Sequence, residues 1–466
     1  MDDDNGPMVF AAILVVVSLV AGAVVLVLVL KPSQPTPAAP TPSVAAAAAV
    51  LPPAPAVLPP ATETVQVQQA VTAGAKQPMP LVAKDPFVPG KRKALKYSYE
   101  TPEFVLYWDI GYLTYTAAEA LEVAKKMAVM AEQAWKEFTR HGFALNPTAL
   151  KFSGQDRYKK PIFMGGACTG GAVQCGFPGG GNFLSKEGDI SFITAGDIGT
   201  LPHELAHLRQ VSSGGFTSGS NVGWAWESCA CYMHEWVSTP VSYYNPPIAM
   251  GVDKLWYERH ALSLELHDGI LSASSGYPYS SWPFWLWIDK TFGFGTVGRM
   301  WSESKPAENV PECLSRLVKK PVADLFGDWI AATLQFSYFN DPKGEPRYIE
   351  FSKLLKETFK SNWWTYFDTA DVRGSTVTVT SAHALQPFGF HAVKLDRLGG
   401  KRLRLDTTID PPSWRMVVIS DGKQAEILAA GVTSAPLGPS GGIVGIISTT
   451  RSTKTLPQNA YSITLS

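Results

Sequence analysis

The sequence carries little charge and no excess of either sign. Lysine plus arginine number 40, aspartate plus glutamate also number 40, and charged residues make up 17% of the 466 residues. No segment concentrates lysine and arginine into the basic surface on which nucleic-acid binding depends. We therefore expect no nucleic-acid partner.

Several motifs are also missing. The glycine-rich segment 165–181 has no Gly-Lys-Ser/Thr after it, which excludes a phosphate-binding loop. None of the 5 cysteines forms a Cys-x-x-Cys pair, so a zinc site built from cysteines is excluded. No repeat of solenoid period is present, which excludes a repeat protein.

The cysteines leave two interpretations open. Cys168 and Cys175 flank the glycine-rich loop and can close it with a disulfide, and either Cys229 or Cys231 can pair with Cys313. Buried free thiols explain Cys229 and Cys231 equally well. The odd number leaves at least one thiol unpaired.

One motif carries chemistry, namely the run His203-Glu204-Leu205-Ala206-His207. Residues four apart lie on the same face of an α-helix, so the two imidazoles can bind a single metal ion. Glu204 then lies beside the metal, where it can take a proton from a metal-activated water. The chain has only 8 histidines, which makes a chance match improbable. The alternative is a surface helix with two unrelated histidines.

The residues after the motif narrow the class. Residues 208–213 lack the glycine and histidine of the metzincin extension, which excludes that class. An aspartate as third ligand shortly after the motif is also excluded, because the next aspartate is Asp253. Further on, residues 224–231 read Trp-Ala-Trp-Glu-Ser-Cys-Ala-Cys, with Glu227 twenty positions after His207. This pattern resembles the gluzincin metallopeptidases, whose second helix often reads Trp-x-x-Glu-Gly-x-Ala. The resemblance is nearest to poorly characterised bacterial members and covers about residues 195–300 in its motifs.

The resemblance implies one Zn²⁺ bound by His203, His207 and Glu227, with Glu204 as general base and proton shuttle. Glu235 is the reserve candidate for the third ligand. The exopeptidase loop Gly-x-Met-Glu-Asn is absent, which favours an endopeptidase over an aminopeptidase.

Two positions depart from the family pattern. Ser228 stands where gluzincins usually have glycine, and Pro202 directly precedes the first histidine. Because proline is tolerated only in the first turn of a helix, we expect the helix to begin just before it, with Thr200 as N-cap.

Two residues are candidates to stabilise the negative charge that develops on the former carbonyl oxygen. Similarity to gluzincins in which a tyrosine precedes an apolar helix selects Tyr279. His234 is the other candidate, because it lies seven residues after Glu227 and hence on roughly the same face of the helix. The alternative for each is a purely structural role.

The N-terminal part predicts a membrane anchor. After the acidic tail of residues 1–7, residues 8–30 form an uncharged apolar run of about 23 residues, enough to span a bilayer. Residues 31–95 read as a linker rich in proline and alanine. Lys31 weakly favours a cytoplasmic C-terminal side, whereas the long spacer favours an extracytoplasmic one. We expect a single-pass membrane protein with its catalytic domain outside the cytoplasm.

The remaining chain predicts an α+β protein. Residues 96–370 suit a zincin-like domain, with strands near 103–108, 161–164 and 190–194, a helix over 116–141, and mostly helix after the motif. We expect the strand 189–193 to line the substrate cleft and accept a peptide by strand addition. Residues 371–466 contain about seven short alternating strands and predict an all-β sandwich domain.

These observations favour a membrane-anchored zinc endopeptidase acting on peptides or proteins. The C-terminal domain would bind a glycan or another cell-surface ligand. Separately, the 14 tryptophans include clusters at 224/226, 282/285/287 and 363/364, and such aromatic clusters can stack on sugars. The alternative is a surface glycan- or protein-binding module with a catalytically degenerate zincin domain. An intact Glu204 favours the enzyme, because binding alone does not need it.

Overall fold

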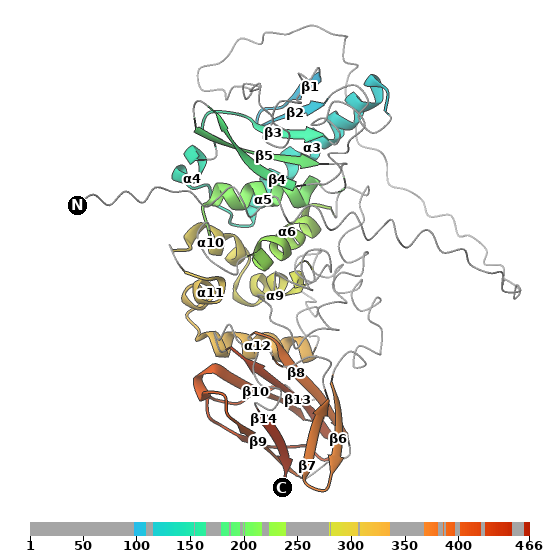
Figure 1. The fold of residues 1–466 in the computed structure, drawn as a ribbon, viewed down its shortest axis with the longest axis vertical. Helices are drawn as coiled ribbons and strands as arrows, with labels where there is room; N and C mark the ends of the chain where they lie inside the picture. The colour runs from blue at the N-terminus through green and yellow to red at the C-terminus, as the bar shows by residue number, and fades with distance from the viewer. Residues whose placement is uncertain are drawn as a thin grey trace, which may run out of the picture.

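The chain folds into mixed helix and sheet, the α+β class expected from its sequence. The computed structural model describes residues 97–108, 115–152, 154–164, 179–185, 188–195, 199, 201–216, 223–238, 279, 281–305, 308–335, 368–380, 385, 388–396, 401–420, 425–449 and 461–466. The first sheet lies at one end of the molecule, helices occupy the middle, and two further sheets form the other end (Figure 1).

The first sheet has five strands in the order β1-β2-β3-β5-β4. They are β1 (Tyr97–Glu100), β2 (Phe104–Trp108), β3 (Lys160–Met164), β4 (Gly179–Ser185) and β5 (Gly188–Ala195). Strands β2, β3 and β5 run parallel, whereas β1 and β4 are antiparallel to their neighbours. Helix α3 and the motif helix α5 pack against this sheet.

The expected cleft strand is wrong by one position in the sheet. Strand β5 contains residues 189–193 but pairs on one side with β3 and on the other with β4. The pairing with β4 runs over nearly all of β5, whereas β3 pairs only with Ile193 to Ala195. β5 is therefore an interior strand, and β4 is the edge strand of the described sheet. The first residues of β4, Gly179 to Gly181, belong to the segment expected to be a loop.

Helix α3 (Ala117–Arg140) matches the helix expected over 116–141 and begins with a capping box at Thr116. The Thr116 side chain accepts a hydrogen bond from the backbone N–H of Glu119, and the Glu119 carboxylate accepts one from the backbone N–H of Thr116. This reciprocal pair satisfies two of the N–H groups that a helix start leaves without a partner. A short helix, α4 (Pro147–Phe152), follows.

The middle layer is helical. It consists of α5 (Leu201–Ser213), α6 (Gly223–Ser238), α9 (Trp282–Phe292), α10 (Thr296–Glu303), α11 (Val310–Val318) and α12 (Val322–Gln335). Turn and breaker signals in the sequence predict helices over residues 281–291, 296–304, 313–319 and 322–336, and the four later helices agree with these. The helices predicted at 254–267 and 351–359 lie outside the described residues. Helix α5 begins at Leu201, with Pro202 in its first turn as expected.

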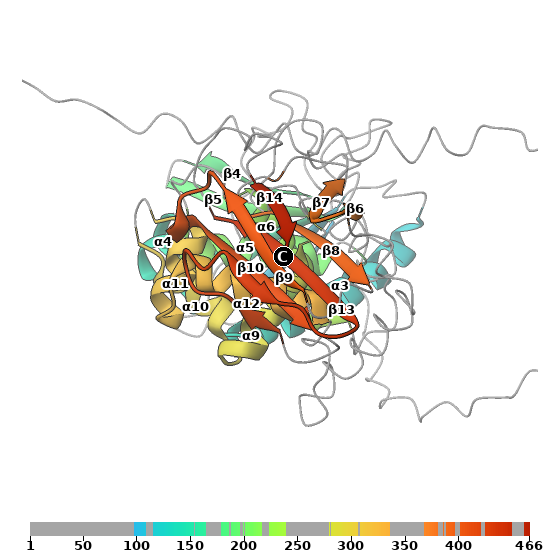
Figure 2. The same ribbon diagram turned by 90° about the horizontal axis from the view of Figure 1, so that it is seen from below.

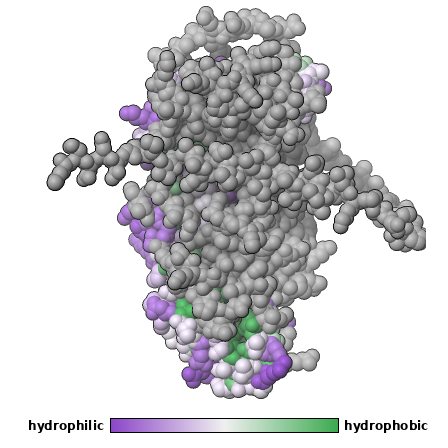
Figure 3. Space-filling view, viewed as in Figure 1, coloured by the Kyte–Doolittle hydropathy of each residue, from purple (hydrophilic) through white to green (hydrophobic). Residues whose placement is uncertain are grey.

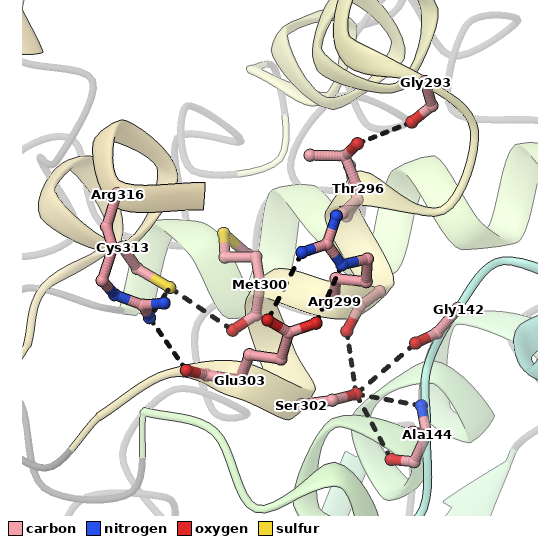
Figure 4. Close-up of polar contacts among 12 residues, drawn as sticks. Gly142, Ala144, Gly293, Thr296, Arg299, Met300, Ser302, Glu303, Cys313 and Arg316 are labelled. Atoms are coloured by element: carbon pink, nitrogen blue, oxygen red, sulfur yellow. Dashed lines mark hydrogen bonds and ion pairs between the residues drawn. The ribbon is translucent and has the colours of Figure 1, made fainter. Parts of the chain in front are cut away.

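Helix α10 is held against the turn that follows α3 (Figure 4). The Ser302 hydroxyl accepts a hydrogen bond from the backbone N–H of Ala144 at 2.9 Å. Gly298 lies so close to this turn that a Cβ atom there would be 2.1 Å from the carbonyl oxygen of His141. Only glycine allows this approach between helix and turn.

The C-terminal end consists of two sheets that face each other across one hydrophobic core. The four-stranded sheet has the order β11-β10-β13-β8 and the five-stranded sheet the order β12-β9-β14-β7-β6. The strands are β6 (Thr369–Arg373), β7 (Thr376–Thr380), β8 (Phe390–Asp396), β9 (Arg402–Thr407), β10 (Trp414–Ser420), β11 (Glu426–Ile427), β12 (Ser434–Pro436), β13 (Gly441–Ser448) and β14 (Tyr461–Leu465), with a 3-10 turn at Pro411–Ser413. We call this pair the double sheet. Figure 2 shows it from below.

The four-stranded sheet is buried on both faces. One face lines the core of the double sheet, and the other packs on α12 as part of the core that extends to the first sheet. This position explains the sequence of β10, Trp-Arg-Met-Val-Val-Ile-Ser, which is apolar on both faces. Strand β9, in the other sheet, alternates between exposed and buried residues.

The expectation of a single-pass membrane protein is wrong. No helix within the described ranges is long and apolar enough to cross a bilayer. Helix α3, with 24 residues, has sufficient length but is amphipathic and carries charged residues along its exposed face. The expected anchor, residues 8–30, lies outside the described part of the chain, as does the linker.

Of the two interpretations left open for Cys229 and Cys231, the structure confirms the buried free thiols and not a disulfide to Cys313. Cys229, Cys231 and Cys313 are buried free thiols. Cys229 Sγ accepts a hydrogen bond from Trp301 Nε1 at 3.2 Å, and Cys313 Sγ donates to the carbonyl oxygen of Met300 at 3.6 Å. Each sulfur thus has a different partner within the helical layer. The pair Cys168 and Cys175 lies outside the described residues.

Most described tryptophans belong to the core and do not form binding platforms. Six of them in the helical layer are at most 3% exposed: Trp224, Trp282, Trp285, Trp287, Trp301 and Trp329. Hydrophobic residues at the surface of the double sheet are interspersed with hydrophilic ones on the face seen in Figure 3. The large hydrophobic residues exposed there are Val372 and Val432, and exposed apolar residues of this kind are normal on a protein surface.

Candidate metal centre

The structure brings His203, His207 and Glu227 together. His203 and His207 lie on adjacent turns of α5, and Glu227 reaches them from the first turns of α6. His203 Nε2 is 3.1 Å from His207 Nε2 and 3.2 Å from Glu227 Oε2, and His207 Nε2 is 3.5 Å from the same oxygen. These three residues are the one group of potential metal ligands found among the described residues.

The triangle of ligand atoms has the size that zinc requires. Nitrogen and oxygen ligands at about 2.0–2.2 Å from a tetrahedral zinc lie about 3.3–3.6 Å from one another. The three observed separations agree with this range to within a few tenths of an ångström. Two imidazoles and a carboxylate are also the donors that catalytic zinc takes, with a fourth position left open. The residues present therefore fit a zinc ion.

The charges of the three groups are coupled. Burial alone would lower the pKa of His207, but the neighbouring Glu227 carboxylate outweighs this effect and raises that pKa to about 9. Burial would raise the pKa of Glu227, yet His207 and His203 hold it well below its usual range. The pKa of His203 is lowered, chiefly by burial. Glu227 is thus a carboxylate, as a metal ligand must be.

Glu204, the expected general base, is a buried carboxyl group. It is 5% exposed, and its Oε2 has no hydrogen-bond partner among the described residues. Burial, opposed in part by the charge of His207, raises its pKa to about 8. A buried carboxyl group with an unused oxygen and a pKa near neutrality can accept and return a proton at physiological pH.

Tyr279 and His234 both lie beside His203. This is the position expected for the two residues that are candidates to stabilise the oxyanion. Their ring centroids are 5.8 Å and 6.2 Å from that of His203. Burial raises the pKa of Tyr279 well above its usual value, so its phenol keeps the proton that it would donate. Burial lowers the pKa of His234 well below its usual value, and a neutral imidazole can also donate. Glu235, the reserve ligand, is not part of the metal-sized cluster.

Ser228, which stands where the gluzincin pattern usually has glycine, links two helices. Its hydroxyl donates to the carbonyl oxygen of Trp224 at 2.6 Å and accepts from Trp285 Nε1 at 2.8 Å, which ties α6 to α9. A second bond between these helices runs from the Tyr232 hydroxyl to Asp289 Oδ2 at 2.8 Å. Because Tyr279 lies just before α9, these bonds also position the phenol near the ligands.

Helix α5 is anchored from its other side by Arg209. This residue is 2% exposed, and its guanidinium donates to the carbonyl oxygen of Phe143 and to the Thr139 hydroxyl. It also stacks on the Trp135 ring, with its central carbon 4.6 Å from the ring centroid. These contacts attach the motif helix to α3, so the histidines rest on rigid elements and not on a loop.

Two residues near the site do not follow from the sequence motifs. Gln210 Oε1 is 2.9 Å from His207 Nδ1, and Gln210 Nε2 donates to the carbonyl oxygen of Trp226 at 3.1 Å. Cys231 Sγ is 3.8 Å from His203 Nδ1. The available signal for Gln210 was its position three residues after His207, which places both side chains on one helix face.

Comparison with known families places the chain in one of them. A family model described as a family of unknown function, DUF6055, matches residues 68–407, and the chain belongs to this family. The match includes the whole metal centre and ends with β9. No curated protein and no solved structure matches the chain.

Proposed function

We propose that the protein is a zinc-dependent peptidase, most simply an endopeptidase. In this proposal residues 96–370 form a zincin-like catalytic domain and residues 371–466 an accessory sandwich domain. One observation carries the proposal: three ligand atoms at the mutual spacing of a tetrahedral zinc, with a buried carboxyl group next to the first of them that has an unused oxygen. A site for metal storage or for structure would not need Glu204.

His203, His207 and Glu227 would hold the ion. When bound, zinc would polarise the scissile carbonyl group and make a water molecule more acidic. Glu204 would remove the proton from the attacking water and deliver it to the leaving amine. Tyr279 or His234, each carrying a proton, would donate a hydrogen bond to the oxyanion.

A peptide substrate also suits the neighbouring sheet. Strand β4 is the edge of the first sheet among the described strands and packs against α5. An extended peptide can add to such an edge through backbone hydrogen bonds. This mode of binding would bring the scissile bond past the motif helix.

The test compares the full-length protein with Glu204→Gln. Zinc content is measured by mass spectrometry, and cleavage is measured with casein and with peptide libraries. We expect one zinc in each protein, and cleavage slower by about 10²–10⁴-fold or more in the variant because the base is lost. Equal zinc in both without cleavage by either would favour a binding module. Absence of zinc from both would overturn the proposal.

A further inference from the structure

The side chain of Gln210 contacts both ligand-bearing helices. It lies on α5, three residues after His207, and is fully buried. Its amide nitrogen donates to the carbonyl oxygen of Trp226 on α6, the residue immediately before Glu227. Its amide oxygen lies 2.9 Å from His207 Nδ1. A single side chain therefore joins the second ligand to the backbone next to the third.

The bond to Trp226 determines how the amide is oriented. A carbonyl oxygen only accepts hydrogen bonds, so the group of Gln210 that faces Trp226 must be the NH₂. The group that faces His207 must then be the amide oxygen, which in turn only accepts. His207 Nδ1 must accordingly carry a hydrogen and donate it to Gln210. In a neutral imidazole this leaves the lone pair on Nε2, the atom that faces His203 and Glu227.

We propose that Gln210 is the positioning residue of the metal centre: it holds His207 in the tautomer that binds metal through Nε2 and keeps Glu227 in register with the two histidines. This inference rests on the proposed function, since it assumes that the three residues take up zinc. Outer partners of this kind orient metal-binding histidines, and their loss typically weakens metal affinity by about 10–100-fold.

His203 has a weaker partner in the corresponding position. Its Nδ1 is 3.8 Å from Cys231 Sγ, and a thiol sulfur is a poor hydrogen-bond acceptor. The geometry therefore gives an order of importance, with Gln210 contributing more to metal affinity than Cys231. A role in packing alone would not produce this order, because both side chains are almost fully buried.

The experiment measures the zinc Kd of the full-length protein by competition with a chromogenic chelator. The variants are Gln210→Leu, which removes both hydrogen bonds, Gln210→Glu, which keeps an acceptor for His207 Nδ1, and Cys231→Ala. The matched control is Ser212→Ala, because Ser212 is also buried on α5 and loses hydrogen bonds to Gln155 and Leu208 without touching a ligand. Thermal unfolding of each metal-free protein is recorded in parallel.

We expect Gln210→Leu to raise the zinc Kd by about 10–100-fold, with Cys231→Ala raising it less and Ser212→Ala leaving it unchanged. Gln210→Glu should recover part of the lost affinity, because it restores the acceptor for His207 Nδ1 but not the donor to the Trp226 carbonyl oxygen. The metal-free Tm of Gln210→Leu should fall no further than that of Ser212→Ala. If Gln210→Leu binds zinc as tightly as the unaltered protein, or if Gln210→Glu binds as weakly as Gln210→Leu, the positioning role is refuted while the proposed function stands. An unaltered protein that binds no zinc would instead refute the proposed function.

Discussion

At the scale of single residues, the site depends on a carboxylate whose position could be guessed only from the spacing to His207. Glu227 and Glu235 lie on the same helix, but only Glu227 has an oxygen close to both imidazoles. The Glu227 carboxylate also accounts for most of the unusual charge state of His207. Removing it changes both the ligand set and the local electrostatics.

Glu227→Gln should weaken zinc binding by more than the loss of an outer partner does, that is, by more than about 100-fold. A neutral amide is a poorer zinc donor and leaves the ion with two protein ligands. Competition titration of zinc gives the Kd of the variant and of Glu235→Gln, the matched change on the same helix. Glu235→Gln should bind zinc normally. The reverse result would make Glu235 the third ligand.

At the scale of elements, helix α11 and the loop before it are held by one ion pair. The Arg316 guanidinium donates to both carboxylate oxygens of Glu308, each at 2.8 Å. These hydrogen bonds lower the pKa of Glu308 to about 2. In the unfolded chain the same group should titrate near its ordinary value of 4.5. The pair therefore stabilises the fold above about pH 5 and ceases to do so as the pH falls from 4.5 towards 2.

Arg316→Gln should lower the free energy of unfolding by about 1 kcal/mol at pH 7. The difference from the unaltered protein should shrink on acidification, because protonated Glu308 has no ion pair to lose. Urea unfolding at pH 7, 4 and 3 measures both effects. Arg299→Gln is the control, since its partner Glu303 is 44% exposed and their pair should contribute less. A difference that is constant with pH would contradict the assignment.

Gly298→Ala tests the close approach of α10 to the turn after α3. The new Cβ atom would lie 2.1 Å from the His141 carbonyl oxygen and 2.4 Å from the Phe143 nitrogen, both of them backbone atoms. Because neither atom can move without shifting the chain, we expect a loss of about 3 kcal/mol, at the upper end for overpacking. Chemical denaturation of this variant and of the surface change Arg299→Ala provides the comparison. Equal stability of the two variants would show that the turn is free to move.

The elements that the sequence predicts best are those with strong local signals. The helix predicted over residues 116–141 is observed as α3, which begins directly after its N-cap Thr116. Strand β9 alternates apolar and polar residues, as the alternating strands predicted for residues 371–466 should, and its buried and exposed residues alternate in the same way. Strand β4 was not predicted, because three consecutive glycines favour a loop and only pairing with β5 makes them a strand.

The residues of the site likewise divide into those predicted from local sequence and those that depend on tertiary contacts. Helical spacing brings His203, Glu204 and His207 together, whereas Glu227 came from a family pattern and not from local physics. The orientation of Gln210 depends on a carbonyl group of another helix, which no local pattern contains. The partners of the cysteines are likewise tertiary, so their spacing could not exclude a disulfide.

At the scale of the whole molecule, helix α12 joins the helical layer to the double sheet. Its buried residues Phe326, Ile330 and Leu334 belong to the same core as the outer face of β8, β10 and β13. Arg415 in β10 adds an ion pair with Asp324 at 2.6 Å. A continuous apolar interface of this kind makes the two parts one cooperative unit.

Leu334→Ala should lower the free energy of unfolding by about 2–5 kcal/mol, as expected for a leucine buried in a core. Calorimetry should show a single transition that moves to lower temperature as a whole. Val432→Ala, at an exposed position of the double sheet, should leave the transition in place. Two separate transitions in Leu334→Ala would mean that the parts unfold independently.

The position of β14 determines when the protein can finish folding. This strand, Tyr461–Leu465, is the last in chain order among those described, yet it lies between β9 and β7 in the middle of its sheet. During synthesis on the ribosome, β7 and β9 emerge early and must wait without their shared neighbour until residue 465 has left the exit tunnel. Closure of this sheet therefore waits for β14, and nascent chains halted before that strand carry two unpaired strand edges exposed to chaperones and to one another.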